Sequence, residues 1–235
     1  MKILAVDTSA TAASVAIAEE NKLIGEFSID TALTHSRTLM PMLEQLLKNT
    51  GRTIDDIEAL AVNAGPGSFT GVRIGVAAVK GLAFSKNLPC VSVSTLHSMA
   101  YNMLGCDCIV CAVMDARCSQ VYNALFRVEG EKVTRLTEDR ALSLSDLNQE
   151  LKSIKEKIIL VGDGAVLCSN YLGTELDNVV LAPFNKRVQT ASSVAYAAFE
   201  KLKLGEKLTA QQLMPVYLRL PQAQRELNKK MGVKQ

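Results

Sequence analysis

Short apolar runs alternate with longer amphipathic stretches along the chain. Apolar runs bounded by charged or turn-forming residues predict strands, and apolar positions recurring every three or four residues predict helices. We expect strands at residues 2–6, 13–18, 23–29, 59–63, 90–93, 109–114, 121–127, 132–136, 158–161 and 179–181. We expect helices near residues 38–49, 70–85, 95–104, 145–155, 165–172 and 191–204. This alternation indicates an α/β protein with mixed sheets.

The pattern starts again about half-way along the chain. Each half opens with an apolar strand that ends in an acidic residue, Asp7 or Asp115, followed by a hairpin and then alternating helices and strands. We therefore predict two duplicated α/β lobes, residues 1–104 and 105–221, and a polar basic tail at residues 222–235. The tail is either a solvated end or a weak contact for nucleic-acid phosphate.

The first two helices carry patterns that favour close packing. Ser36 or Thr38 could cap the first helix, and a cap at Thr38 would place Pro41 in the first turn. An apolar stripe on this helix is wider than one-sided packing requires, and a small-residue face on the second helix would let another helix approach. We expect a partner interface there, although burial of the stripe within its own lobe is the alternative. The interface residues would be Leu39, Leu43, Leu46, Gly71, Gly75 and Ala78.

Composition and charge exclude several classes of protein. The 26 basic and 24 acidic side chains give a net charge of +2, which is too balanced for a broad basic nucleic-acid surface. Aromatic residues make up 5% of the chain and Trp is absent, which disfavours base-stacking platforms. Neither a membrane span nor a signal peptide is expected, so we predict a cytoplasmic protein with reduced cysteines.

Two groups of small and acidic residues could be a remnant of a phosphate-binding site. Glycines allow close backbone approach, and free amides at a helix start favour an anion. The ordinary alternative is a set of tight turns, with Thr70 capping the second helix. Phe69 is unusual in this loop because it is apolar where a loop is normally polar. The candidates are Asp7, Thr8, Ser9, Gly65, Gly67 and Ser68 in the first half and Asp115, Gly162 and Gly164 in the second.

Metal binding is not expected. Cys106, Cys108 and Cys111 could begin a metal site, but no fourth ligand is evident and Cys111 lies within an apolar strand. Free thiols are the better interpretation. For His35 we favour a structural hydrogen bond, and for His97 half-buried packing.

Residues 65–75 read Gly-Pro-Gly-Ser-Phe-Thr-Gly-Val-Arg-Ile-Gly, which resembles the signature of the bacterial TsaB family, also called YeaZ. Residues 3–9, 35–36, 114–117 and 215–219 resemble further elements of the family. The resemblance therefore extends over nearly the whole chain. It implies a two-lobed actin-like fold of the ASKHA and ribonuclease H-like type.

The resemblance also implies a role in making N6-threonylcarbamoyladenosine (t6A), the modified base beside the anticodon of tRNAs that read codons starting with A. In that pathway a synthase makes threonylcarbamoyl-AMP, and the related subunit TsaD transfers the threonylcarbamoyl group to tRNA. A TsaB-type chain is a non-catalytic partner that pairs with TsaD, helps recruit the ATPase TsaE and meets tRNA through the complex. Alone, it would form a homodimer. ATP or ADP and Mg would be bound at the level of the complex, with no cofactor held firmly by this chain.

Two departures from catalytic relatives agree with a non-catalytic role. TsaD-type subunits carry a His-x-x-x-His pair, whereas His35 and His97 are far apart in this chain. Catalytic actin-like ATPases also use a glycine-rich second loop, and residues 115–118 contain no glycine. A small ATP-dependent kinase or ATPase is the alternative, favoured by Asp7 and the loop at 65–71. A peptidase is disfavoured because no Ser/His/Asp or metal constellation is recognisable.

Overall fold

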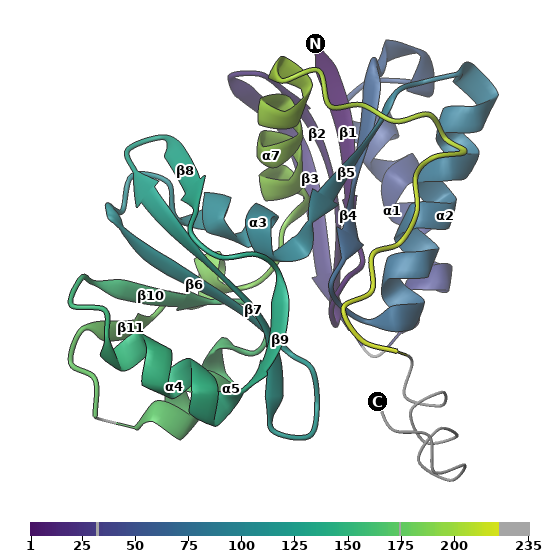
Figure 1. Cartoon of the computed structure of the whole chain (residues 1–235). Helices are drawn as coiled ribbons and strands as arrows, with labels where there is room; N and C mark the ends of the chain where they lie inside the picture. The colour runs from purple at the N-terminus through teal and green to yellow at the C-terminus, as the bar shows by residue number, and fades with distance from the viewer. Residues whose placement is uncertain (32, 174, 221–235) are drawn as a thin grey trace, which may run out of the picture.

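The computed structural model of the chain describes residues 1–31, 33–173 and 175–220. Two α/β lobes lie side by side, each built on one mixed sheet (Figure 1). The predicted tail at 222–235 lies outside the described residues. No helix within the described ranges is both long and apolar enough to cross a membrane.

The first lobe contains the five-stranded sheet. Its strands are β1 (Lys2–Asp7), β2 (Ala12–Glu19), β3 (Lys22–Asp30), β4 (Ala59–Gly65) and β5 (Cys90–Ser94). Its helices are α1 (His35–Asn49), the short 3₁₀ helix η1 (Ile54–Asp56) and α2 (Phe69–Lys86). Helices α3 (Thr95–Ala100) and η2 (Tyr101–Met103) then lead into the second lobe.

The second lobe contains the six-stranded sheet. Its strands are β6 (Cys108–Asp115), β7 (Gln120–Glu129), β8 (Lys132–Arg135), β9 (Arg140–Ser143), β10 (Ile158–Val161) and β11 (Val179–Leu181). Its helices are α4 (Leu144–Lys152), α5 (Ala165–Leu172) and α6 (Phe184–Arg187), and α7 (Ala191–Lys203) follows them in the chain.

The two sheets have the same strand order, which confirms the duplication that the sequence predicts. In the first sheet the order is β3-β2-β1-β4-β5, and in the second β8-β7-β6-β10-β11, with β9 also paired to β7. The first two pairings along each path are antiparallel and the last two parallel. Each lobe thus joins a hairpin to a parallel unit, as mixed α/β sheets do.

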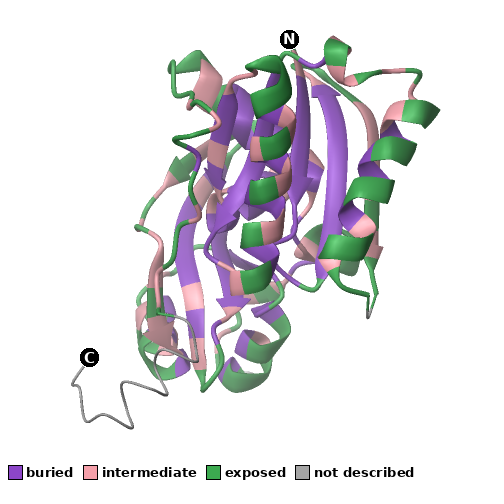
Figure 2. Ribbon diagram, turned by 90° about the vertical axis from the view of Figure 1, so that its right-hand side faces the viewer, coloured by how far each residue is buried: buried purple, intermediate pink, exposed green. Residues whose placement is uncertain are grey.

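Both faces of the first sheet are covered. Leu4 and Val6 pack toward α1 and α2, whereas Ile3 and Ala5 pack toward α7. This two-sided burial explains the nearly continuous apolar run of β1, and the central strands are buried throughout in Figure 2. Because α7 comes from the C-terminal part of the chain, position in the sequence does not by itself assign a segment to a lobe. The domain limits at 104 and 105 stay a prediction.

Several predicted helix ends are wrong. Helix α1 begins at His35 after Thr34, not after Ser36 or Thr38, so Pro41 lies inside the helix. The His35 ring lies 2.8 Å from the Ala10 carbonyl oxygen and fixes this start in place of a side-chain cap.

Helix α2 is capped by Ser68, whose Oγ accepts a hydrogen bond from the Gly71 amide, and not by Thr70. The predicted helix at 95–104 divides into α3 and η2. Strand β9 and helices η1 and α6 are short and were not predicted from the sequence.

Candidate functional site

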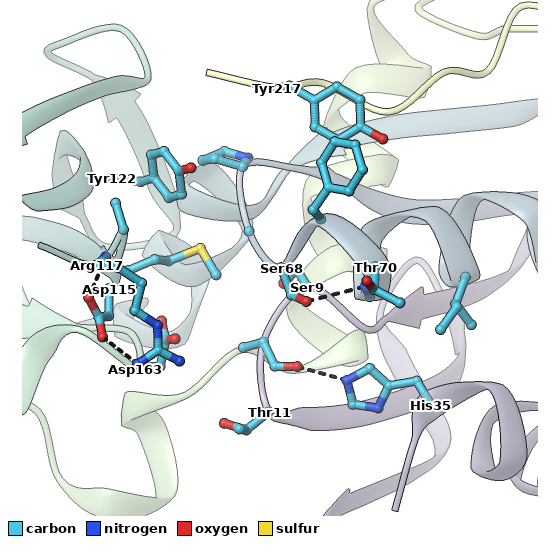
Figure 3. Close-up of a pocket in the computed structure, with 18 of the residues that line it drawn as sticks. Ser9, Thr11, His35, Ser68, Thr70, Asp115, Arg117, Tyr122, Asp163 and Tyr217 are labelled. Atoms are coloured by element: carbon cyan, nitrogen blue, oxygen red, sulfur yellow. Dashed lines mark hydrogen bonds and ion pairs between the residues drawn. The ribbon is translucent and has the colours of Figure 1, made fainter. Parts of the chain in front are cut away.

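A cavity of about 650 Å³ lies between the lobes, where the ends of β1 and β6 approach each other (Figure 3). We call it the front cleft. Loops from both lobes and the segment after α7 form its walls. The polar residues that line it include Ser9, Thr11, His35, Ser68, Thr70, Asp115, Arg117, Asp163, Tyr217 and Arg219.

Three aspartates from the two lobes come together near the front cleft. Asp7 is only 1% exposed, and its Oδ1 accepts a hydrogen bond from the Ser9 amide at 2.8 Å. Burial raises the pKa of Asp7. Asp115 Oδ1 accepts from the Arg117 amide at 2.7 Å, and its Oδ2 pairs with the Arg117 guanidinium at 3.3 Å. Asp163 lines the cleft, where desolvation, with smaller effects from Asp115 and Asp7, raises its pKa to about 6.

The glycines of the 65–75 segment pack against the chain's own backbone. A Cβ at Gly67 would meet the Ser9 carbonyl, and one at Gly71 would meet the Thr8 carbonyl, both closer than real Cβ atoms come. A Cβ at Gly75 would lie 2.5 Å from the Thr8 hydroxyl oxygen, which donates to the Gly71 carbonyl at 2.7 Å. The segment therefore packs α2 against the loop after β1.

The remaining candidate glycines also have contacts within the chain. A Cβ at Gly65 would meet the Val216 carbonyl, and one at Gly162 would meet the Val113 carbonyl. Gly164 packs in the same way against the backbone of Met114 and Asp115. The residues suggested as a phosphate cradle are thus used for internal packing. Ser9, Gly67 and Ser68 also line the front cleft, and a phosphate-binding role for these residues stays a prediction, as does nucleotide binding at the level of a complex.

The expected partner residues are also internal. Leu39, Leu43 and Leu46 are 1–2% exposed and belong to the core beneath α1. Gly71 and Gly75 are buried and Ala78 is half-buried against the same core. The prediction that these six residues form a partner surface is corrected, because the wide stripe reflects burial in the first lobe. The exposed positions on these helices are others, among them Met40, Ala77, Gly81 and Phe84.

The two histidines have structural roles, as predicted. The His35 ring makes the bond to Ala10 described above. The half-buried His97 ring stacks on Phe126 at 5.4 Å, and burial lowers its pKa to about 4. Near it, Ser94 Oγ donates to Asp139 at 2.5 Å. A peptidase triad would need a His ring between these two groups, and no such ring contact occurs within the described part of the chain.

The cysteine cluster is not brought together. All six cysteines are free thiols. Cys108 and Cys111 belong to the cores on opposite faces of β6, so one ion cannot bind both. Burial raises the pKa of both thiols, which keeps them protonated.

Residues 213–219 contribute to the site in a way that the sequence did not predict. Leu213 is fully buried in the first-lobe core, and the Val216 amide donates to the Ala64 carbonyl at 2.7 Å. Tyr217 stacks on Phe69 with centroids 4.6 Å apart, and Arg73 lies over the Phe69 ring. The apolar character of Phe69 was the only signal for this contact.

Arg219 then crosses to the second lobe. Its guanidinium donates to the Ala116 carbonyl at 2.7 Å, so the segment after α7 connects both walls of the front cleft. We call residues 213–219 the strap.

Comparisons with known proteins agree with this architecture. TsaB of Bacillus subtilis, a tRNA threonylcarbamoyladenosine biosynthesis protein, is 32% identical over 95% of this chain and 96% of its own length. The chain belongs to the TsaB family. The Escherichia coli TsaB is 31% identical over 93% of this chain and 95% of its own. A family model described as TsaD, tRNA N6-adenosine threonylcarbamoyltransferase, matches residues 29–227, so the chain also belongs to that wider family.

Comparison with solved structures identifies the fold. YeaZ from Pseudomonas aeruginosa superimposes with a TM-score of 0.79 at 26% identity, covering 92% of this chain and 99% of that one. Component A of the Acidaminococcus fermentans (R)-2-hydroxyglutaryl-CoA dehydratase gives a TM-score of 0.50 at 12% identity over 86% of this chain and 99% of its own, which is a likeness of fold alone. The chain is a two-lobed actin-like α/β protein.

Proposed function

We propose that the chain takes part in t6A biosynthesis as a non-catalytic partner of a TsaD-type transferase and helps to recruit a TsaE-type ATPase. The observation that carries this proposal is the match to TsaB proteins of that pathway over nearly the full length of the chain. In this proposal the chain supports the transferase through protein contact and meets tRNA through the complex. Alone, it would pair with a second copy.

The geometry of the front cleft favours a non-catalytic role. Asp7 is buried and its backbone neighbours pack against α2, so it is poorly placed to hold a hydrated cation. In the second lobe, Arg117 stands in the loop where a glycine-rich phosphate loop would be needed. The alternative of a kinase or ATPase depends on these groups and is weaker for that reason.

The proposed partner surface is the exposed side of α1 and α2. Phe84 is 73% exposed and Met40 is 49% exposed. A Cβ at Gly81 would meet nothing within 4 Å, so a partner helix has room to approach there. This surface replaces the buried positions that the sequence suggested.

The test measures TsaD binding and tRNA modification with and without this chain. Phe84→Glu and Met40→Glu should weaken TsaD binding and t6A formation, because each places a charge on the proposed partner surface. The chain should stay folded, because both side chains face solvent. The matched control is Phe184→Glu, which changes an 83% exposed phenylalanine in the second lobe. Unchanged t6A formation when the chain is omitted would contradict the proposed function. Normal TsaD binding by both variants would contradict only the proposed surface.

A further inference from the structure

A second cavity, of about 620 Å³, lies at the opposite end of the lobe interface. Strand β2 starts beside the front cleft and ends at Glu19, and the cavity begins at the turn that follows it. The other walls come from α7, from η2 with the residues after it, and from the turn between β7 and β8. Both lobes therefore contribute to it. We call this space the rear cavity.

The rear cavity carries an excess of negative charge. Glu20, Glu131 and Glu200 line it together with one cation, Lys203, which leaves a net charge of −2 on the lining. Lys203 Nζ lies 3.2 Å from the Glu20 carboxylate and 3.0 Å from that of Glu200. Glu131 has no ion pair within the described ranges of the chain. The carboxylates therefore outnumber the cations available to them.

Aromatic rings form the apolar part of the lining. Phe199 is 4% exposed and Tyr101 is 9% exposed, whereas Tyr196 is 41% exposed. The Tyr101 hydroxyl is a polar group at the cavity that has no hydrogen-bond partner among the described residues. Burial raises the pKa of Tyr101 to about 12, so the phenol stays neutral. The hydroxyl oxygen is not among the fully enclosed polar atoms without a partner, so it remains accessible to a ligand or water in the cavity.

We propose that the rear cavity binds the alkylammonium group of an organic cation. The carboxylates attract the ammonium group, the Tyr101 oxygen accepts one of its N–H bonds, and the aromatic rings contact the charge and the alkyl chain. A volume of about 620 Å³ lies within the range of small-molecule sites. The ammonium group comes either from a free polyamine or from a lysine side chain of another protein.

The test is calorimetric titration of the full chain with 1,8-diaminooctane, with 1,8-octanediol as the neutral probe of the same length. The diamine should bind with a saturable isotherm and the diol should not. Glu200→Gln and Tyr101→Phe should each weaken diamine binding, the first by about tenfold because a charged hydrogen bond is lost. Lys203→Gln should tighten it by about threefold, because it removes the cation that competes for Glu20 and Glu200.

Two controls separate this site from general charge and from misfolding. Glu44→Gln removes an exposed carboxylate of α1, away from the rear cavity, and should leave diamine affinity unchanged. A damaged fold cannot produce the tighter binding expected of Lys203→Gln. The proposal is overturned by absence of saturable diamine binding, by equal binding of the diol, or by equal weakening in Glu44→Gln and Glu200→Gln.

The source of the ammonium group is tested with two further probes. Spermidine represents a free polyamine, and a blocked Gly-Lys-Gly peptide represents a lysine side chain. The tighter of the two identifies the source, provided that Glu200→Gln weakens its binding. If Glu200→Gln affects neither probe, the assignment of Glu200 to the site is wrong.

Discussion

The loop after β1 and the loop after β6 begin alike and then differ. In each, the aspartate that ends the strand accepts a hydrogen bond from the amide two residues later, at 2.8 Å for Asp7 and 2.7 Å for Asp115. In the first loop Thr8 and Ser9 are fully buried. In the second, Arg117 and the two residues after it are exposed and have positive φ angles of 65°, 56° and 55°.

The difference arises from what covers each loop. Helix α2 and the turn before it cover the first loop, because Gly71 and Gly67 leave room for the backbone of Thr8 and Ser9. The second loop has no such cover, and the Arg219 side chain of the strap reaches its base at Ala116. The two lobes therefore share the same turn after their first strand, but the turn has a different role in each. The first loop is buried against α2, and we call it a packing joint. The second loop is an exposed cleft wall. The predictions below change one of these loops or a residue that contacts it, and most include a matched control.

The largest effect is expected from Gly71→Ala. The added Cβ would meet the Thr8 carbonyl at a distance that real Cβ atoms do not show, so α2 must move away from the first loop. Overpacking of this kind should cost about 3 kcal/mol, which lowers the unfolding midpoint of a chain of this size by about 6–12 °C. Thermal unfolding followed by circular dichroism measures it.

Gly81→Ala is the matched control on the same helix. A Cβ there meets nothing within 4 Å, so the substitution should be neutral or stabilise by up to about 1 kcal/mol. If Gly71→Ala and Gly81→Ala have the same midpoint, the close contact between α2 and the first loop is not what holds that loop.

The next effect concerns the second loop. Arg219→Gln removes the hydrogen bond to Ala116 that connects the strap to this loop. A charge-assisted bond of about 1.4 kcal/mol would make amide exchange at residues 116–120 about tenfold faster, with no change at residues 8–11. Hydrogen exchange with mass spectrometry measures both loops in one experiment. Equal acceleration in both loops, or acceleration in Arg37→Gln on the exposed side of α1, would contradict this role.

The sequence predicted the strands and the duplication because both follow from local patterns of apolar and acidic residues. Alternating apolar runs define most strands, and the acid that ends β1 and β6 marks the repeat. Strand β9 was missed because its sequence, Arg-Ala-Leu-Ser, has no apolar run like those of the equally short β10 and β11 and no hairpin glycine beside it like that of β8.

The site was predicted less well, since spacing shows which residues share a face but not what that face meets. Gly71 and Gly75 lie on one face of α2, as predicted, but the neighbour is the first loop and not another helix. The width of the apolar stripe on α1 likewise indicates that much of the helix is buried, but not which part of the protein buries it. The contact of Phe69 with Tyr217 joins residues far apart in the chain, and an apolar residue at position 69 does not show which residue it contacts.

A smaller effect is expected at Asp163, where charges from the two loops meet. Its pKa of about 6 in the folded chain is above the ordinary value of 3.8. Between these pH values the folded chain holds a proton that the unfolded chain releases, so the contribution of Asp163 to stability falls as pH rises from about 4 to 6. Asp163→Asn should therefore raise the unfolding midpoint above pH 6 and have less effect below pH 4.

Asp115→Asn tests the contribution of the second loop to that pKa. Removing the Asp115 charge should lower the pKa of Asp163, as measured by carbon NMR of the side-chain carboxyl. Asp177→Asn, an exposed change elsewhere in the second lobe, should leave it unchanged. A pKa of Asp163 that is insensitive to Asp115→Asn would show that the second loop does not contribute to the shift.

The smallest expected effect is a change in the free energy of unfolding on substitution by glycine, which has opposite signs in the two loops. Cys118 has a φ of 56°, a conformation that costs a non-glycine residue about 1–2 kcal/mol, and its side chain is exposed. Cys118→Gly should relieve this strain and, after the entropy cost of glycine, stabilise the chain by about 0.5–1 kcal/mol. Ala10 in the first loop is 8% exposed and has no positive φ, so Ala10→Gly loses a buried methyl group and should destabilise by about 1 kcal/mol. Urea unfolding resolves differences of this size when the denaturant slope is unchanged. Destabilisation by both substitutions would mean that the second loop is held as tightly as the first, and the contrast between a packing joint and an exposed cleft wall would then be wrong.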